Sequence, residues 1–446
     1  MSVVARAALH LQREFALVRP SSASSQVVES PQSSDSSGSS GSSADLHSPA
    51  GVEAFARAVL GTLAEPGDGA LGRLIAALGA TRTADLLLEA ASVHRITGEA
   101  ADGGESFTAK EVETALARWT PRIDHASFVR GLAQSERVGA AFLVPGDASW
   151  PVGVDDLGVH APLGLWVRGD VRHLRPDAPA VALVGARAAT GYGEHMTMEL
   201  SAGLVDRGLT IVSGGAYGID GMAHRAALAS EGATVAFLAG GVDRFYPVGH
   251  DGLLQRIAET GAVVSELPCG ASPTKWRFLQ RNRLIAAASA ATVVLEAGAR
   301  SGSLNTAAHA AALGRPLGAL PGPVTSPASA GCHRLLREFD AVCVVNADQV
   351  VELMGGIARA ESTAASGEEG VAEGMPVVPA GTGSEASPTA VRVLDALSMR
   401  APRDIDDLAR RSGLGAREVM AVLGVLELDD VVRQRAAGWV RRRRAG

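Results

Sequence analysis

The chain has 446 residues, of which 46% are hydrophobic, and a formal net charge of −7 at pH 7. This length predicts two or three domains with substantial cores, and the acidic balance excludes a protein that coats nucleic acid indiscriminately, so any nucleic-acid contact must be local. The three cysteines suggest no disulfide framework, and no run approaches the roughly 18 apolar residues of a membrane span, so we expect a cytoplasmic protein without membrane contact.

The N-terminal part divides into two segments. Residues 1–50 combine a short arginine-bearing stretch with a serine-rich run and lack the apolar core of a signal peptide, which predicts a disordered extension. Residues 52–137 have helical periodicity interrupted by glycines and polar turns, which predicts a small helical domain. Its basic residues are sparse and mixed with acids, which favours a structural or protein-contact role over DNA binding of the helix-hairpin-helix type.

Residues 138–354 are expected to form an α/β domain. Short apolar runs alternate there with helical patterns, at 181–184, 210–212, 234–238, 262–264 and 292–295. Such alternation implies right-handed crossovers and a doubly wound parallel sheet, whose strand-to-helix loops all emerge at one edge. These loops, which we call the rim, comprise residues 185–187, 213–220, 240–243, 265–266 and 296–303. They are rich in glycine, and helix N-termini point at them, so the rim is predicted to bind phosphate groups.

The glycine patterns do not match the common nucleotide motifs. No G-x-x-x-x-G-K-[ST] sequence is present, which argues against a P-loop NTPase. The segment starting at Gly185 is not G-x-G-x-x-G, and Ser213 stands where an acid would hold a ribose. We therefore expect no nucleotide cofactor.

Charge is unevenly distributed around the rim. Between Glu266 and Glu296 there is no acidic residue, whereas Lys275 and three arginines (Arg277, Arg281 and Arg283) fall there, interleaved with Trp276 and Phe278. Arg187 also lies in an acid-free stretch. Cations beside aromatic rings suit single-stranded DNA, because a ring stacks an unpaired base for roughly 1–3 kcal/mol. For a single arginine, pairing with an acid or capping a helix remains an equal alternative; the cluster together with Arg187 favours DNA binding.

Asp220 and His224 share a helix face, and with Glu266 and Glu296 at the same edge they suggest acid–base or metal chemistry. No third metal ligand stands at suitable spacing. We therefore favour an Asp220 that satisfies loop N–H groups and a packed, hydrogen-bonded His224, with no catalytic residue and no metal.

The C-terminal part predicts a linker and a winged helix. Residues 355–387 are rich in Gly, Ala, Ser, Glu and Pro without periodicity, which indicates a flexible linker. Over residues 388–443, helical patterns at 390–397, 405–411 and 416–428 precede a hairpin signal, and three helices with a hairpin form a winged helix. The third helix is apolar and acidic, which favours protein contact over base recognition.

Several segments resemble the DNA-processing protein DprA/Smf family. These are S-G-G-A-Y-G-I-D-G-M-A-H from Ser213, F-L-Q-R-N-R-L-I-A from Phe278 and E-A-G-A-R-S-G-S-L-N-T-A from Glu296. The resemblance covers about residues 52–354 and, more loosely, the winged helix. It implies an extended Rossmann-like domain that binds single-stranded DNA, forms a homodimer and loads RecA in natural transformation and recombination, without being an enzyme.

The resemblance also assigns residues. Arg187 matches the arginine of the family's V-G-[ST]-R loop, with Ala186 in place of the hydroxyl, and Lys275 and Phe278 match a lysine and an aromatic residue near bound DNA. Tyr217 stands where the family often has a basic residue. The expected DNA-binding set is Gly185, Arg187, Ser213, Gly214, Gly215, Gly218, Lys275, Phe278, Arg281, Asn282, Arg283, Arg300, Ser301 and Gly302.

The competing class is a nucleotide-processing enzyme on the same fold, such as a phosphoribohydrolase. Glu266, Glu296 or Asp220 would then act as acid and base on a bound nucleotide. That enzyme family's P-G-G-x-G-T loop is absent, which favours the binding protein.

Overall fold

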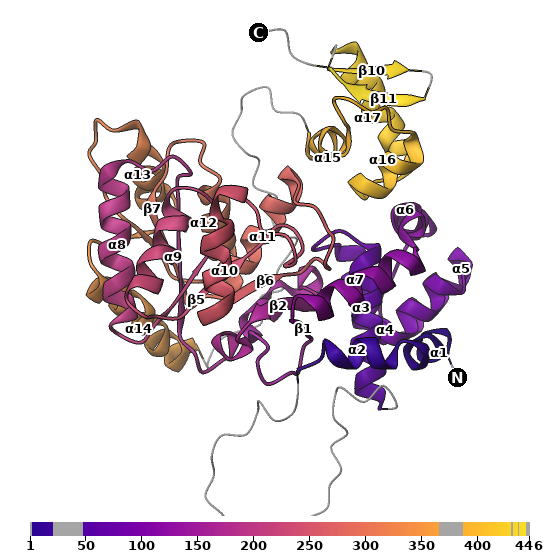
Figure 1. The fold of residues 1–446 in the computed structure, drawn as a ribbon, viewed down its shortest axis with the longest axis horizontal. Helices are drawn as coiled ribbons and strands as arrows, with labels where there is room; N and C mark the ends of the chain where they lie inside the picture. The colour runs from indigo at the N-terminus through magenta and orange to yellow at the C-terminus, as the bar shows by residue number, and fades with distance from the viewer. Residues whose placement is uncertain (1, 21–47, 365–386, 430, 436, 443–446) are drawn as a thin grey trace, which may run out of the picture.

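The computed structural model describes residues 2–20, 48–364, 387–429, 431–435 and 437–442 (Figure 1). The serine-rich run and most of the expected linker lie outside these residues. The described chain forms a helical domain, a domain built on a large sheet, and a C-terminal winged helix, in the order that the sequence predicts.

The helical domain contains seven α-helices: α1 (Val3–His10), α2 (Gln12–Leu17), α3 (Pro49–Leu63), α4 (Gly69–Leu88), α5 (Val93–Asp102), α6 (Ala109–Trp119) and α7 (His125–Arg137). Six of them begin at a side-chain cap, for example Asp68, whose carboxylate accepts from two backbone N–H groups of α4. Such caps satisfy N–H groups that have no partner within the helix.

The expectation of disorder over residues 1–50 is wrong for α1 and α2. Val4, Ala8 and Phe15 recur at helical spacing and are buried, with the Phe15 ring edge-on to Phe55 at 5.4 Å. Arg19 then donates to the carbonyl oxygen of Phe142 at 2.5 Å. The serine-rich composition that follows these two short helices obscured their apolar periodicity.

The sheet has nine strands in the order β1-β2-β6-β5-β4-β3-β7-β8-β9. All neighbouring strands are parallel except β1–β2 and β2–β6. The strands are β1 (Ala140–Leu143), β2 (Leu165–Gly169), β3 (Ala180–Gly185), β4 (Thr210–Ser213), β5 (Thr234–Phe237), β6 (Ala262–Ser265), β7 (Ala291–Glu296), β8 (Leu317–Ala319) and β9 (Val342–Cys343). All five expected strands form, within one or two residues of their predicted ends. The three-residue β8 was not expected, because a run that short carries no periodicity.

Helices cover both faces of the sheet, and the strands alternate accordingly. Val181 and Leu183 of β3 pack against α8 (Gly191–Val205), α9 (Ile219–Ala229) and α14 (Ala347–Ala364), on the face that also carries α10 (Asp251–Thr260). Ala182 and Val184 face α11 (Lys275–Ala287), α12 (Ser303–Ala312) and α13 (Ala330–Glu338). Four 3₁₀ segments complete the domain: η3 (Val152–His160), η4 (Val171–Leu174), η5 (Val248–His250) and η6 (Pro327–Ser329); η2 (Thr120–Arg122) lies between α6 and α7 in the helical domain.

The strand order reverses beside β3. From β3 the chain moves outward through β4, β5 and β6, and it then returns to place β7 on the other side of β3. In doubly wound sheets, ligands bind outside the carboxyl ends of the strands at such a reversal. The loops that carry Arg187 and Arg300 follow β3 and β7, so they flank this position.

The winged helix consists of α15 (Pro388–Ala396), α16 (Ile405–Ser412), α17 (Ala416–Leu428) and a hairpin of β10 (Val432–Arg435) and β11 (Gly438–Arg441). It has a hydrophobic core of its own, which includes Val393, Leu408 and Leu423. These observations confirm the predicted winged helix. The expected linker starts too early, because α14 continues to Ala364. Among the described helices, none is long and apolar enough to cross a membrane.

Candidate nucleic-acid interface

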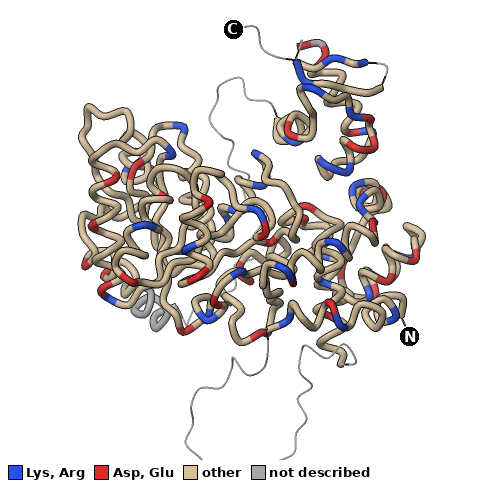
Figure 2. Tube along the Cα trace, viewed as in Figure 1, with Lys and Arg blue, Asp and Glu red and all other residues tan. Residues whose placement is uncertain are grey.

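The rim brings exposed cations together at the carboxyl edge of the sheet. Arg187 follows β3, Arg300 follows β7, and Lys275 begins α11 after β6; all three side chains are exposed. Within the described residues, none of the three forms an ion pair with a carboxylate. Acidic and basic residues are otherwise interspersed over all three domains (Figure 2). Unpaired cations at this edge therefore form the local positive surface that the sequence predicts.

Phe278 is the centre of an aromatic and cationic cluster. The Arg187 guanidinium lies 5.1 Å from the centroid of this half-buried ring, and that of Arg281 lies 5.8 Å from it. The ring of Tyr246 packs against Phe278 with centroids 5.6 Å apart. The three elements that meet here are the β3–α8 loop, the β5–α10 loop and the first turn of α11. A cation held over a ring in this way supports both phosphate binding and base stacking.

The sequence interpretation missed a shared property of the tyrosines. The chain has only three, and all of them lie in or beside the rim: Tyr192 is 40% exposed, and Tyr217 and Tyr246 are each 47% exposed. Tyr217 Oη accepts from the backbone N–H of Gly249 at 3.2 Å, which fixes its ring near the β5–α10 loop. Aromatic residues make up only 4% of the chain, so the position of all three tyrosines after successive strands could have indicated an aromatic surface at the rim.

The rim glycines allow neighbouring loops to touch. Gly218 has φ +75°, and a Cβ there would lie 2.2 Å from the carbonyl oxygen of Ala186 in the adjacent loop. A Cβ at Gly214 would lie 2.5 Å from Arg281 Nη1. A Cβ at Gly185 would lie 2.6 Å from the Ile219 side chain and one at Gly215 3.0 Å from Leu254, whereas Gly302 is open to solvent. A side chain at Gly218 would therefore push two rim loops apart, and one at Gly214 would displace the Arg281 guanidinium.

The arginine–asparagine–arginine segment of α11 fixes three of these loops from beneath. Arg281 Nη1 donates to the carbonyl oxygen of Gly214, in the loop after β4, at 2.6 Å. It also donates to the carbonyl oxygen of Phe237, at the end of β5, at 2.5 Å. Asn282 Nδ2 donates to Asn305 Oδ1 at 3.2 Å and to the Gly302 carbonyl at 3.4 Å, after β7. Burial lowers the pKa of Arg281 to about 10, against the opposing effect of Asp220. These side chains set the height and spacing of the loops.

Two other arginines of α11 pair with acids, as the alternative interpretation holds. Arg283 is buried and its Nη2 lies 2.8 Å from Glu266 Oε2, while Arg277 pairs at 2.8 Å with Glu65, whose side chain is 8% exposed. Of the cations that the sequence groups together on this helix, Lys275 is the one whose side chain faces solvent. The charge that is available to a ligand is thus smaller than the sequence suggests.

Asp220 and His224 organise the β4–α9 loop. The Asp220 carboxylate accepts from the N–H of Gly214 at 3.2 Å, and burial raises its pKa. His224 Nε2 accepts from the N–H of Gly215 at 3.3 Å, and its Nδ1 lies 2.7 Å from Thr234 Oγ1. Burial, with His250 and Arg281 nearby, lowers the pKa of His224 to about 3, so the imidazole stays neutral. The predictions that Asp220 satisfies loop N–H groups and that His224 is packed and hydrogen-bonded are confirmed.

The remaining rim carboxylates are also held by the protein. Glu296 accepts from the backbone N–H of Thr190 at 2.8 Å and from its Oγ1 at 2.6 Å, which fixes the loop that bears Arg187. Glu266 is the partner of Arg283. Across the described residues, no group of three His, Cys, Asp or Glu side chains could hold a metal ion. These contacts give the acids structural roles at the rim.

Comparison with known proteins identifies two matching families. Residues 141–355 match the family of DNA recombination-mediator protein A, and residues 378–438 match the DprA winged helix domain. A DNA processing protein DprA of Mycobacterium tuberculosis is 47% identical over 313 residues, 68% of this chain and 77% of the relative. Protein Smf of Escherichia coli is 36% identical, over 64% of this chain and 73% of the relative. The crystal structure of DprA from Streptococcus pneumoniae matches with a TM-score of 0.54 and 29% identity, over 67% of this chain and 97% of that one.

Proposed function

Because the chain belongs to the DprA/Smf family of DNA recombination-mediator proteins, we propose that its rim binds single-stranded DNA without sequence specificity. The observation that carries this proposal is the cluster in which Arg187 and Tyr246 contact Phe278. It combines an unpaired cation with partly exposed rings beside the reversal of strand order. An unpaired base offers its flat face to such rings, whereas a duplex keeps its bases stacked inside.

In the proposed complex, Arg187, Lys275 and Arg300 bind phosphates along the edge of the sheet. Backbone N–H groups at the starts of α9 and α12, near Gly218 and Gly302, add donors, since both helices begin without a side-chain cap. Phe278 stacks a base, with Tyr246 beside it and Tyr217 on the next loop. Arg281, Asn282 and Arg283 contribute by holding these loops, and Ser213, Gly214 and Gly215 by forming the turn after β4.

The biological setting follows from the family. We infer that the protein acts in the cytoplasm as a homodimer, protects incoming single strands and delivers RecA to them during natural transformation and recombination. It does so by binding and not as an enzyme, because the rim carboxylates are already engaged by Arg283, Thr190 and the loop amides.

Affinity for single- and double-stranded DNA of equal length, measured by fluorescence anisotropy over a salt series, tests the proposal. We expect much tighter binding of the single strand and a steep loss of affinity with salt, because bound cations release counterions. Equal affinity for duplex, or affinity that does not depend on salt, would contradict it. The molar mass from light scattering tests whether the protein is a dimer. The formation of RecA filaments on protein-coated single strands tests the delivery of RecA.

The enzymatic alternative has its own test. Nucleoside monophosphates incubated with the purified protein should remain intact, with Glu266→Gln and Glu296→Gln as comparisons. Release of free base by the wild-type chain, and its loss in either variant, would favour the phosphoribohydrolase.

A further inference from the structure

The winged helix lies against the first turn of α11, beside the proposed DNA-binding cluster. The backbone N–H of Lys275 donates to Asp395 Oδ2 of α15 at 2.6 Å. The Arg392 guanidinium of the same helix lies 5.4 Å from the centroid of the Trp276 ring. Both residues that begin α11 are therefore in contact with another domain.

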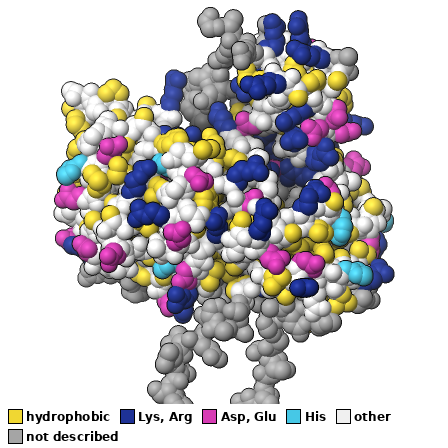
Figure 3. Space-filling model, viewed as in Figure 1, with side chains coloured by type: hydrophobic (Ala, Val, Ile, Leu, Met, Phe, Trp, Pro, Cys, Tyr) yellow, Lys and Arg dark blue, Asp and Glu magenta, His cyan; other side chains and the backbone are white. Residues whose placement is uncertain are grey.

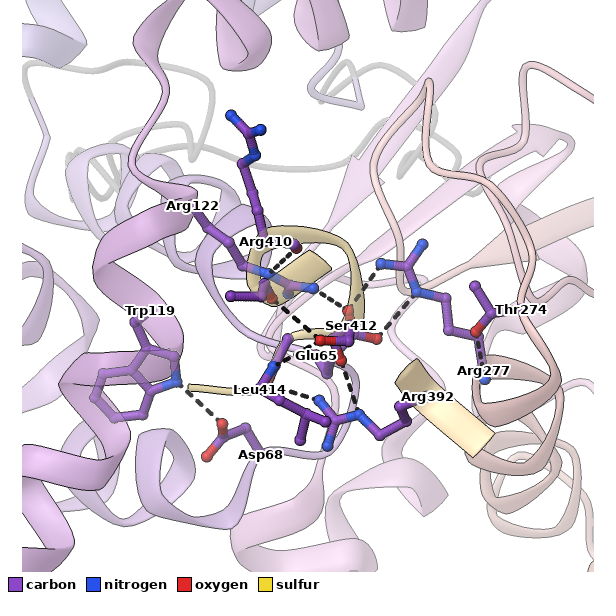
Figure 4. Close-up of polar contacts among 12 residues, drawn as sticks. Glu65, Asp68, Trp119, Arg122, Thr274, Arg277, Arg392, Arg410, Ser412 and Leu414 are labelled. Carbon is purple, nitrogen blue, oxygen red and sulfur yellow. Dashed lines mark hydrogen bonds and ion pairs between the residues drawn. The ribbon is translucent and has the colours of Figure 1, made fainter. Parts of the chain in front are cut away.

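Polar side chains form a second part of this contact. Glu65 of the helical domain pairs with Arg122 and with Arg277 of α11, and Arg122 Nε donates to the Arg410 carbonyl of the winged helix at 3.0 Å (Figure 4). A Cβ at Gly413 would lie 2.6 Å from Glu65 Cγ. Since the winged helix keeps a separate hydrophobic core, it can leave this position without exposing that core.

We propose that the winged helix covers the α11 end of the single-strand path and that DNA displaces it, because Asp395 occupies the position of a phosphate beside Lys275. This inference rests on the proposed function of the rim. Lys275 and Phe278 are separated by one helical turn and lie on the same side of α11. A DNA strand that stacks on Phe278 and continues to Lys275 meets the Asp395 carboxylate. This carboxylate repels a phosphate and accepts from the backbone N–H of Lys275, which a phosphate would otherwise accept from.

The basic side chains around this contact fit a cover that opens. Lys and Arg side chains gather where the winged helix meets the rest of the molecule (Figure 3). Arg122, Arg277 and Arg392 are among the residues at this junction, and Glu65 is the carboxylate that two of them share. Separation of the winged helix therefore uncovers Arg122 and Arg277, which together with Glu65 carry one net positive charge, beside the path of the strand.

A disulfide can lock the winged helix in place. A Cβ at Gly415 would lie 3.4 Å from the Cβ of Ala117 in α6, close to the separation in natural disulfides. Gly415 has φ −67°, which any residue adopts. The test protein is the full chain with Ala117→Cys and Gly415→Cys. Cys343→Ser removes the exposed native thiol, since the other two cysteines are buried.

The readout is the affinity of the oxidised and reduced protein for oligo(dT) of about 20 nucleotides. We expect the oxidised form to bind about tenfold or more weakly, because its binding-competent fraction falls, and reductant to restore the affinity. Each single-cysteine chain should show no redox response. Equal or tighter binding by the oxidised form would overturn the proposal that the winged helix covers the strand path. If neither form binds the oligonucleotide, the proposed function itself fails.

A second variant tests the same contact without a crosslink. Asp395→Asn removes the charge at the α11 N-terminus and should tighten binding about two- to fivefold. Asp429→Asn makes the same charge change at an exposed position of the winged helix and serves as the matched control. Equal affinities for these two variants would show that Asp395 does not compete with DNA.

Discussion

Replacing Phe278 with alanine tests the base-stacking part of the proposed interface. The ring is half-buried and contacts Arg187 and Tyr246, both of which are exposed. Stacking of one base on an aromatic side chain is worth about 1–3 kcal/mol by alanine substitution. We therefore expect Phe278→Ala to weaken binding of single-stranded DNA by about 5- to 150-fold.

The salt dependence separates stacking from phosphate binding. A phenyl ring carries no charge, so the slope of log affinity against log salt should stay that of the wild type. Phe278→Trp keeps a flat ring and should retain most of the affinity. Because the ring is only half-buried, the alanine variant should lose less stability than the roughly 3–5 kcal/mol typical of a fully buried phenylalanine. Anisotropy titrations at several salt concentrations and a thermal melt measure these quantities.

Two results would refute this reasoning. If Phe278→Ala binds as tightly as the wild type while folded, no base stacks on the ring. If the variant unfolds, the ring is part of the hydrophobic core. Arg337→Ala, at an exposed position on α13, controls for general effects of surface substitution.

The other predictions concern charge and burial. Arg187→Ala and Lys275→Ala should each weaken binding of all sequences alike and lower the salt slope by about 0.7, as for one lost phosphate contact on a single strand; an unchanged slope in both would remove them from the interface. Arg283→Ala leaves Glu266 without its buried partner and should lower the free energy of unfolding by about 3–5 kcal/mol in urea denaturation, whereas a loss below about 1 kcal/mol would mean that the pair is not buried in solution. The folded pKa of His224, about 3, lies below its unfolded value of about 6.5, so the unfolded state binds the extra proton. Between these values, stability should fall as the pH falls, by about 1.4 kcal/mol per pH unit, and His224→Gln should flatten that dependence if the single histidine causes it.

The order of domains and the sheet could be predicted because their signals are local and repeated. Apolar runs such as 181–184 are bounded by glycine, and their alternation with helices leaves few topologies. Helices α1 and α2 were missed because each is short, and their stability comes from burial of Phe15 and Arg19 against distant residues. The local sequence pattern does not predict contacts between residues that are far apart in the chain.

Within the candidate site, residue type was predictable but exposure was not. Arg187 and Lys275 face solvent as expected, whereas Arg281 and Arg283, of the same type and in the same cluster, are buried. The difference depends on which side of α11 meets the sheet and on partners such as Glu266, which is 17 residues from Arg283 in sequence. The contact of the winged helix with α11 depends on folded surfaces for the same reason.

The attachment of three rim loops to one helix separates the framework of this surface from its chemistry. Arg281 and Asn282 hold the loops by main-chain and amide contacts, which do not depend on the identity of the exposed residues between them. Substitutions at the outward positions, such as Ala186 and Tyr217, can then alter affinity one residue at a time while the backbone keeps its place. A surface organised in this way can be adjusted to new ligands by natural variation or by engineering, provided that α11 is left intact.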